Sequence, residues 1–215
     1  MTDVQTQEIL LEDPKRTHEL GRAIGAACLG GEHLCLRGDL GAGKTTLVRG
    51  LAEGLGVDPG SISSPTFTIL HEHRGGHGGL GLVHADLYRI GDADELEALG
   101  WEELRSDGSM VLAVEWPERV PEALPAPAMV LTLQHGPEPT ARHLRLDVSV
   151  RAPHLLVAAV GRSCRTCGGT VTPGSSCAPF CSDRCRLADL GNWFGGRYAI
   201  SREIEEDDLV DPEIG

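Results

Sequence analysis

The sequence feature that most constrains the fold is the glycine-rich run from Gly38 to Thr45, which follows the pattern Gly-x-x-x-x-Gly-Lys-Thr. A short apolar segment at 33–36 precedes the run, and apolar residues at helical spacing follow it from Leu47. Glycine adopts positive φ without strain, so such a loop can turn backbone amides toward one point at the start of a helix. The run predicts a strand, a phosphate-binding loop and a helix in succession. An ordinary glycine turn is the competing interpretation.

Two residues of this run and two acidic residues beyond it have the chemistry of a magnesium-nucleotide site. Lys44 would place its ammonium on the β- and γ-phosphates of ATP, and the Thr45 hydroxyl would enter the Mg²⁺ shell. A further carboxylate usually comes from the end of a neighbouring buried strand. Glu115 directly follows a continuous apolar run, and Asp86 lies near the end of another apolar segment. Lys44, Asp86 and Glu115 are therefore the predicted catalytic residues, although either acid could instead be an exposed strand-end residue.

The remaining patterns predict an α/β fold. Strands interleaved with helices after a glycine loop favour a P-loop NTPase-like sheet flanked by helices, with parallel pairing near the loop. Later alternating segments favour antiparallel additions. The predicted strands are 33–36, a strand entered from the loop 61–70, 80–87, 110–114, 129–133 and 143–150. The predicted helices are 17–29, one opening at 47, 92–104 and 155–160.

Charge and hydropathy exclude several classes of function. The formal net charge is −13, which disfavours direct binding to a nucleic-acid duplex because phosphates are normally neutralised by a basic surface. No apolar run approaches the ~18 residues that a membrane helix requires, so no membrane partner is expected. The N-terminus shows no basic region before an apolar stretch, as a secretory signal would. The predicted location is the cytoplasm.

Five of the seven cysteines lie between residues 164 and 185. Cytosolic thiols stay reduced, so metal binding is favoured over a disulfide framework. The pairs Cys164-x-x-Cys167 and Cys181-x-x-x-Cys185 are separated by thirteen residues, which suits a tetrahedral Zn²⁺ with a structural role. Cys177 also lies between the pairs, so a different set of four ligands is an open alternative.

The chain is predicted to contain two folded domains and a tail. The first, 5–160, is the P-loop ATPase domain, and the second, 162–202, is a small zinc-ribbon-like module that cannot bury a stable apolar core without a metal. The expected minimal core around the metal consists of Phe180, Leu190, Trp193 and Tyr198. The tail, 203–215, is strongly acidic and is expected to be disordered.

Four segments together resemble the TsaE family of ATPases. They are Gly38 to Thr46, Ser64-Pro65-Thr66-Phe67, His84-Ala85-Asp86-Leu87-Tyr88-Arg89 and Glu115-Trp116-Pro117. The resemblance spans most of residues 5–160. It implies the ATPase component of the bacterial machinery that makes N6-threonylcarbamoyladenosine (t6A) at position 37 of tRNAs reading ANN codons. It also implies that the chain does not itself transfer the threonylcarbamoyl group, but resets a partner heterodimer of the TsaB–TsaD type and meets tRNA only indirectly.

The same resemblance implies roles for individual residues. Thr45 and Glu115 would hold Mg²⁺, and Asp86 would polarise or position the attacking water. Trp116 would lie near the adenine. A switch-like segment at 64–66 would lie close to the γ-phosphate. The full predicted nucleotide-binding set is Thr17, Gly38, Asp39, Gly41, Ala42, Gly43, Lys44, Thr45, Thr46, Thr66 and Trp116.

Two residues implied by the resemblance lie outside the phosphate loop in the sequence. Thr17 matches a family threonine at the edge of the nucleotide. Arg142 corresponds to a family basic residue that faces the nucleotide, and an ordinary surface arginine is the equal alternative at that position.

The C-terminal cysteine segment resembles the YacG zinc proteins. The resemblance rests on Cys164-Arg165-Thr166-Cys167-Gly168 and on the run from Pro179 to Trp193, and Cys177 has no counterpart in the family motif. It implies zinc binding by Cys164, Cys167, Cys181 and Cys185, and it implies binding to the gyrase B protein with inhibition of DNA gyrase. The chain departs from the family pattern at Arg165 and at 194–197.

Three other functions share parts of these motifs. A small-molecule kinase would share the phosphate loop, but it needs an acceptor pocket, and no lid segment or arginine cluster follows Lys44. The zinc module could instead be a generic protein-interaction adaptor. It could also bind nucleic acid, which its acidic tail opposes. The basic residues that would serve such binding are Arg162, Arg165, Arg184, Arg186 and Arg197.

Overall fold

The computed structural model describes residues 4–63, 69–124, 126–171 and 176–194 of the chain. Two compact units are present, Met1–Gly161 and Arg162–Gly215. The predicted tail 203–215 and the predicted nucleotide-binding residue Thr66 lie outside the described residues. Within the described ranges, none of the helices combines the length and the apolar character needed to cross a membrane.

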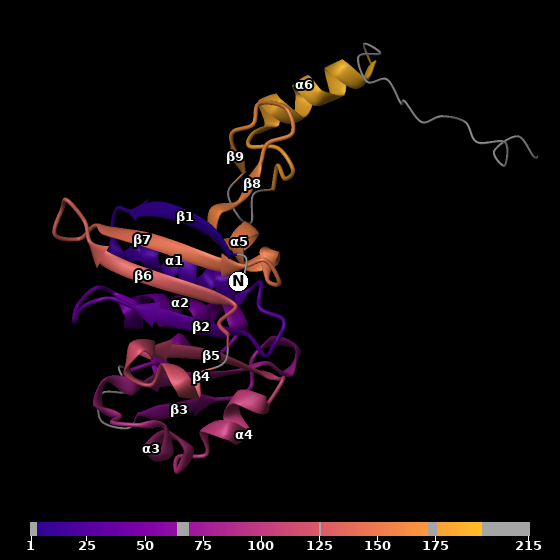
Figure 1. Cartoon of the computed structure of the whole chain (residues 1–215). Helices are drawn as coiled ribbons and strands as arrows, with labels where there is room; N and C mark the ends of the chain where they lie inside the picture. The colour runs from indigo at the N-terminus through magenta and orange to yellow at the C-terminus, as the bar shows by residue number, and fades with distance from the viewer. Residues whose placement is uncertain (1–3, 64–68, 125, 172–175, 195–215) are drawn as a thin grey trace, which may run out of the picture. The chain divides into compact units, whose positions relative to one another are not determined.

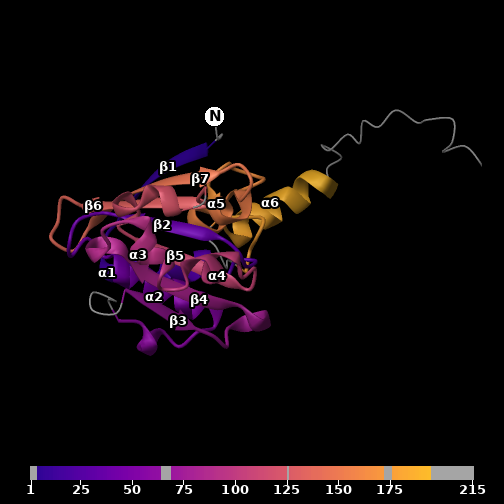
Figure 2. The ribbon, with the colours of Figure 1, turned by 60° about the horizontal axis from the view of Figure 1, so that its bottom comes forward.

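The first unit is built on a seven-stranded sheet with the order β1-β7-β6-β2-β5-β4-β3, which runs from top to bottom in Figure 1. The strands are β1 (Val4–Leu11), β2 (His33–Arg37), β3 (Leu70–His73), β4 (Gly81–Asp86), β5 (Met110–Glu115), β6 (Met129–His135) and β7 (Arg142–Ser149). The central strands β4, β5, β2 and β6 are parallel. The strand β3 pairs antiparallel with β4, β7 pairs antiparallel with β6, and β1 pairs antiparallel with β7. Figure 2 shows β1 and β3 at opposite edges. The predicted α/β sheet with antiparallel additions is confirmed.

Helices cover both faces of this sheet. They are α1 (Pro14–Gly25), α2 (Lys44–Leu55), α3 (Ala93–Glu97), α4 (Trp101–Ser106) and α5 (Pro153–Val160), with short 3-10 helices at Pro59–Ser61, His77–Gly79, Leu87–Arg89, Pro117–Arg119 and Pro121–Ala123. Residues of α1, α2 and α5 share one core with Leu36, Val111 and Leu131 of the sheet. Alternate residues of β4 and β5 point to the other face and pack there with α3 and α4. The two cores together fix the central parallel strands.

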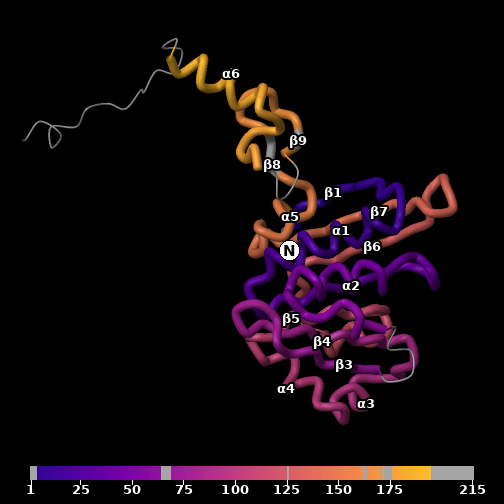
Figure 3. Tube along the Cα trace, turned by 180° about the vertical axis from the view of Figure 1, so that it is seen from behind, coloured from indigo at the N-terminus to yellow at the C-terminus, as the bar shows by residue number. Residues whose placement is uncertain are grey.

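The helices α1 and α2 are neighbours in Figure 3, and glycines on both let their backbones come into close contact. A Cβ added to Gly21 of α1 would lie 2.1 Å from the carbonyl oxygen of Leu47, and one added to Gly50 of α2 would lie 2.0 Å from the carbonyl oxygen of His18. Any larger residue at these positions would therefore push the helices apart. The contact holds the start of α2, where the phosphate loop ends, against α1.

Three elements differ from the predicted ones. The sequence pattern predicts no strand at 4–11, because β1 is an edge strand in which Leu11 alone is buried, so it shows no apolar alternation. The predicted helix 92–104 consists of α3 and α4, since Gly100 with φ 78° interrupts it. The first helix begins at Pro14, where the Asp13 side chain accepts a hydrogen bond from the Arg16 N–H, and ends earlier than predicted, at Gly25.

The second unit contains a two-stranded antiparallel ribbon and one helix. The ribbon is β8 (Arg162–Ser163) with β9 (Thr170–Val171), and the helix is α6 (Asp183–Phe194). The prediction that Leu190 and Trp193 pack into a minimal core is wrong, because their side chains are 47% and 65% exposed. Figure 1 shows α6 extending away from the ribbon of the same unit. Phe180 is half-buried, and Tyr198 lies outside the described residues.

Candidate functional site

The predicted phosphate loop connects β2 to α2 at the carboxyl end of the parallel strands. Gly38, Gly41 and Gly43 have φ values of 135°, 76° and 101°, a region that residues with side chains rarely adopt. At Gly38 a Cβ would also lie 2.3 Å from the carbonyl oxygen of Leu133. Because α2 begins directly at Lys44, its free N–H groups and dipole point at the same place as the loop amides. The loop has the backbone of an anion site.

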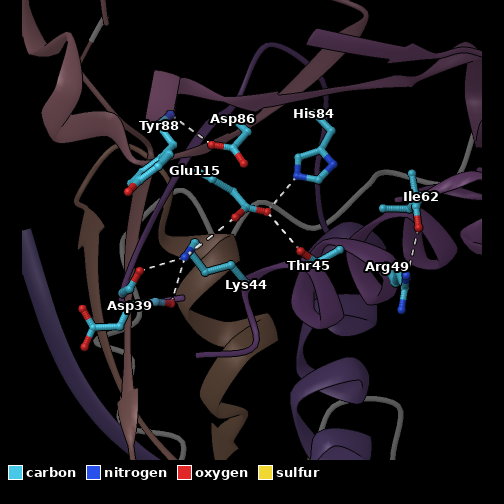
Figure 4. Close-up of polar contacts among 10 residues, drawn as sticks. Asp39, Lys44, Thr45, Arg49, Ile62, His84, Asp86, Tyr88 and Glu115 are labelled. Carbon is cyan, nitrogen blue, oxygen red and sulfur yellow. Dashed lines mark hydrogen bonds and ion pairs between the residues drawn. The ribbon is translucent and has the colours of Figure 1, made fainter. Parts of the chain in front are cut away.

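Lys44 lies where the loop and an acidic side chain meet (Figure 4), and an aromatic ring lies beside its ammonium. Its side chain is 5% exposed, and its Nζ donates to the carbonyl oxygens of Gly38 at 2.7 Å and Asp39 at 3.1 Å. The same Nζ lies 3.8 Å from Glu115 Oε2 and 4.3 Å from the centroid of the Trp116 ring. An ammonium held in this way is available to phosphate oxygens placed over the loop.

Glu115 is held at the end of β5 by three neighbours. Its Oε1 accepts a hydrogen bond from Thr45 Oγ1 at 3.4 Å and lies 2.9 Å from His84 Nε2, while its Oε2 faces Lys44. Asp86 is its Cα partner on β4, so the two parallel strands bring both predicted acids to one edge. Hydroxyl and carboxylate oxygens are the ligands that Mg²⁺ prefers, and here they lie within hydrogen-bonding distance of each other. The residues present fit a magnesium site.

Asp86 is a nearly buried carboxylate, with 7% of its surface exposed. Its Oδ1 accepts the N–H of Tyr88 at 3.0 Å. Burial raises the pKa of the Asp86 carboxyl above its usual value, and the hydrogen bond from Tyr88 opposes this shift. A strand-end acid of this kind differs from an ordinary exposed one, because keeping it charged carries an energetic cost.

These side chains surround a pocket with a volume of about 430 Å³. It is lined by Leu40, Gly41, Ala42, Gly43, Lys44, Thr45, Thr46, Asp86, Tyr88, Glu115 and Trp116. Thr17 is not part of this lining; it is buried on α1, and its hydroxyl donates to the Asp13 carbonyl at 3.3 Å. The Trp116 ring lies 5.0 Å from the Tyr88 ring, and its backbone has a φ of 58°, unusual for a bulky residue. Its placement near an adenine stays a prediction.

Arg142 binds the outside of the phosphate loop. Its Nε and Nη2 donate to the carbonyl oxygens of Ala42 and Gly41, both at 3.1 Å, and its Nη1 donates to Pro139 and Ala141 at 2.8 and 2.7 Å. The guanidinium therefore ties the first residue of β7 to the loop. Because the carbonyls of Gly41 and Ala42 point to Arg142, the orientation of the adjoining peptide groups is fixed.

Arg142→Ala is expected to weaken nucleotide binding about tenfold, the equivalent of one charge-assisted hydrogen bond of about 1.5 kcal/mol. The reason is that the loop must then be ordered by the nucleotide itself. The matched control is Arg145→Ala on the same strand, whose exposed guanidinium pairs with Asp147 at 3.0 Å. Titration with a fluorescent nucleotide measures both, and equal affinities in the two variants would contradict the role of Arg142.

The second unit brings the four predicted zinc ligands together. The Sγ atoms of Cys164, Cys167, Cys181 and Cys185 all lie within 4.8 Å of one another, and that of Cys181 is 3.5 Å from those of Cys167 and Cys185. Sulfurs around Zn²⁺ at ~2.3 Å are ~3.8 Å apart in a tetrahedron, so the donor set fits this ion. Cys177 is not a member of this cluster of described residues.

Backbone hydrogen bonds close the first chelating turn, and a side-chain hydrogen bond links it to the second. The N–H of Cys164 donates to Gly169 at 2.7 Å, and the N–H of Gly168 donates to Cys164 at 2.8 Å, which closes the first turn. The hydroxyl of Thr166 donates to the Cys185 carbonyl at 2.9 Å and links the first turn to α6. The cluster thus joins the ribbon to the helix.

Sequence patterns missed one residue of the nucleotide site as a contributor in its own right, His84, and pointed to another, Arg142, only through the family resemblance. His84 appears only as one letter of a resembling segment, and its contact with Glu115 spans 31 positions of sequence. The contacts of Arg142 with the loop span 100 and 101 positions. No local pattern signals either contact, because each depends on which strands become neighbours.

Comparisons with known proteins agree with this geometry. Residues 11–144 match the family model described as threonylcarbamoyl adenosine biosynthesis protein TsaE, and residues 162–211 match the one described as DNA gyrase inhibitor YacG. The TsaE protein of Streptomyces coelicolor is 39% identical over 73% of this chain and 99% of its own length. That of Aquifex aeolicus is 44% identical over 53% and 78%.

A solved structure extends the comparison to the fold. The crystal structure of Bacillus subtilis YdiB matches with a TM-score of 0.58 and 30% identity, over 73% of this chain and 95% of that one. Both resemblances noted in the sequence are confirmed by the family matches. The chain therefore belongs to the TsaE family, and it carries a C-terminal segment that matches the YacG family.

Proposed function

We propose that this chain is the ATP-hydrolysing component of the t6A37 tRNA-modification machinery and acts with a partner heterodimer of the TsaB–TsaD type. The observation that carries the proposal is the convergence of Lys44, Thr45 and Glu115 on one pocket at the phosphate loop. Relatives that share this part of the chain are named as tRNA threonylcarbamoyladenosine biosynthesis proteins.

Each residue has a distinct role in the proposed reaction. The loop amides and Lys44 would bind the β- and γ-phosphates of ATP, and Thr45 and Glu115 would hold Mg²⁺, which supplies positive charge beside the phosphates. Asp86 would accept a hydrogen bond from the attacking water and orient it. Tyr88 and Trp116 would shield this pocket from bulk water on the side where their rings meet.

The test is ATP hydrolysis by the full-length chain, alone and with the purified heterodimer, together with t6A formation on unmodified tRNA. We expect slow hydrolysis alone, faster hydrolysis with the heterodimer, and repeated rounds of t6A synthesis only when the chain and ATP are present. A kinase would instead need a small-molecule acceptor for phosphate transfer. Absence of hydrolysis under both conditions would refute the proposal.

Substitution of Asp86 by asparagine tests whether this acid is catalytic or structural. Asp86→Asn is expected to slow ATP hydrolysis while raising the thermal stability of the nucleotide-free protein near neutral pH. The raised pKa means that the folded state disfavours the carboxylate, so stability is lost as pH rises from the unfolded pKa of ~3.9 through the folded one. An amide removes this cost and still accepts the Tyr88 N–H.

The measurements are melting temperature and turnover at neutral pH, with melting repeated at a pH below the unfolded pKa, where the stability difference should vanish. Asp92→Asn is the control, since Asp92 caps α3 at an exposed position and accepts the Glu95 N–H at 2.9 Å. Unchanged turnover in Asp86→Asn would remove Asp86 from the proposed mechanism.

We propose for the second unit that 162–202 is a zinc-stabilised module that binds the gyrase B protein. The cysteine cluster and the match to the YacG family support this. Supercoiling by purified gyrase should fall as the full-length chain is added, and Cys181→Ser should abolish the effect. Unchanged supercoiling at saturating protein would refute gyrase inhibition and favour a generic adaptor.

A further inference from the structure

The histidine at the centre of β4 has a position that packing alone does not explain. His84 is fully buried, with 0% of its surface exposed, between strand neighbours that are apolar. Its Cα partner on β5 is Ala113, so Glu115 lies two residues further along β5 on the same face. Diagonal neighbours of this kind are close enough for their side chains to meet.

The hydrogen bond between them fixes one oxygen of the carboxylate. His84 Nε2 lies 2.9 Å from Glu115 Oε1, which is the shortest contact of that carboxylate among the described residues, and Thr45 Oγ1 lies 3.4 Å from the same oxygen. The other oxygen, Oε2, is 3.8 Å from Lys44 Nζ. An ionised carboxylate only accepts, so Nε2 carries the hydrogen.

The other ring nitrogen of His84 lowers the stability of the fold. Its Nδ1 is buried and has no hydrogen-bond partner within the described part of the chain. An unpaired buried polar atom costs ~1–3 kcal/mol, which an apolar side chain at this position would avoid. The stability of the sheet therefore does not account for a histidine, whereas the bond to Glu115 does.

We infer that His84 is a positioning residue that holds the Glu115 carboxylate in place for Mg²⁺ and keeps its ion pair with Lys44 long. The inference rests on the proposed nucleotide–magnesium site. Lys44 and Glu115 already form an ion pair at 3.8 Å, and without the Nε2–H donor the carboxylate can turn further toward Lys44 and shorten this pair to a direct hydrogen bond. That pair would occupy both the oxygen ligand of the metal and the ammonium that the phosphates need.

The experiment measures nucleotide binding as a function of Mg²⁺, without relying on hydrolysis. A fluorescent ATP analogue is titrated in chelator and at rising Mg²⁺ into the wild-type chain and its variants. In His84→Leu, the Mg²⁺ concentration at half-maximal tight binding is expected to rise roughly 10- to 100-fold. His84→Gln should restore most of the wild-type behaviour, since its amide N–H can reach the place of Nε2, and the shorter His84→Asn should not.

Two controls distinguish positioning from general damage to the sheet. His73→Leu changes a histidine of the neighbouring strand that contacts Ser61 at 3.2 Å, and it should keep the wild-type Mg²⁺ dependence. In a Glu115→Gln background, His84→Leu should add no further shift, because the carboxylate it positions is gone.

Failure of the proposed role of His84 can be told apart from failure of the proposed ATPase function. Failure of the wild-type chain to hydrolyse ATP would refute the ATPase but leave this binding measurement valid. Wild-type Mg²⁺ dependence in both His84→Leu and His84→Asn would overturn the role of His84. So would a loss of binding in His84→Gln and His84→Asn that is equally large with Mg²⁺ and with chelator, since that result means structural damage only.

Discussion

Replacing Lys44 by alanine is expected to reduce the rate of ATP hydrolysis by a factor of roughly 10²–10³ while leaving the zinc content of the chain unchanged. Lys44 is the one cationic side chain among the described residues that line the pocket. Alanine leaves the loop amides in place but removes the positive charge nearest to the β- and γ-phosphates. Zinc content should not change, because the cysteine cluster belongs to the other compact unit.

The sequence offers a matched control for this prediction. The chain has one other lysine, Lys15, which is exposed on α1 and lies 3.9 Å from Glu19. Lys15→Ala should hydrolyse ATP at the wild-type rate. Phosphate release at saturating ATP with the heterodimer present, and metal analysis of the same samples, check both statements. Hydrolysis retained by Lys44→Ala would overturn the assignment of the phosphate loop.

Loss of the zinc ligands is expected to unfold the second unit and to spare the first. Cys181→Ser removes a ligand whose Sγ lies 3.5 Å from two others. The described part of this unit buries few apolar side chains, with Leu187, Leu190 and Trp193 exposed, so metal binding must supply most of its folding free energy. Structural zinc in small modules contributes ~10–16 kcal/mol, which exceeds what such a unit can otherwise gain.

Hydrogen exchange followed by peptide mass analysis reads out the two units separately. In Cys181→Ser, or after chelation of the wild type, amides of α6 should lose protection, while those of β2, β5 and α2 keep theirs. Cys177→Ser is the matched control and should retain zinc and protection, since Cys177 is not in the described cluster. Release of zinc by Cys177→Ser would show that the ligand set is wrong.

Sequence reasoning predicted the parts of the fold that have strong local patterns. The run Met110–Glu115 is a continuous buried strand, and Gly38 to Thr45 is a loop between a strand and a helix, as predicted. The edge strand Val4–Leu11 was not predictable, because its residues are mostly exposed and its partner, β7, is more than a hundred positions away. The break at Gly100 gives no signal in the apolar spacing, which continues across it.

The candidate site was predictable only as far as residue chemistry allows. Lys44, Thr45 and Glu115 carry recognisable chemistry, and the register of β4 with β5 is what brings Asp86 and Glu115 to the same edge. A sequence shows that acids follow two apolar runs, but it does not show that those runs become neighbouring strands. The same register brings His84 close enough to contact Glu115 Oε1, the oxygen that also accepts from Thr45. This contribution of His84 therefore cannot be seen in the sequence.

The backbone contact between α1 and α2 has a mechanical consequence for the nucleotide site. Helices that touch through side chains can absorb a small displacement by changing rotamers, whereas Gly21 and Gly50 leave no side chain between the two backbones to do so. The pair should respond to force as one stiff body. A shift at the phosphate end of α2 would then be passed to α1, and through Leu11 to the end of β1, the edge strand of the sheet.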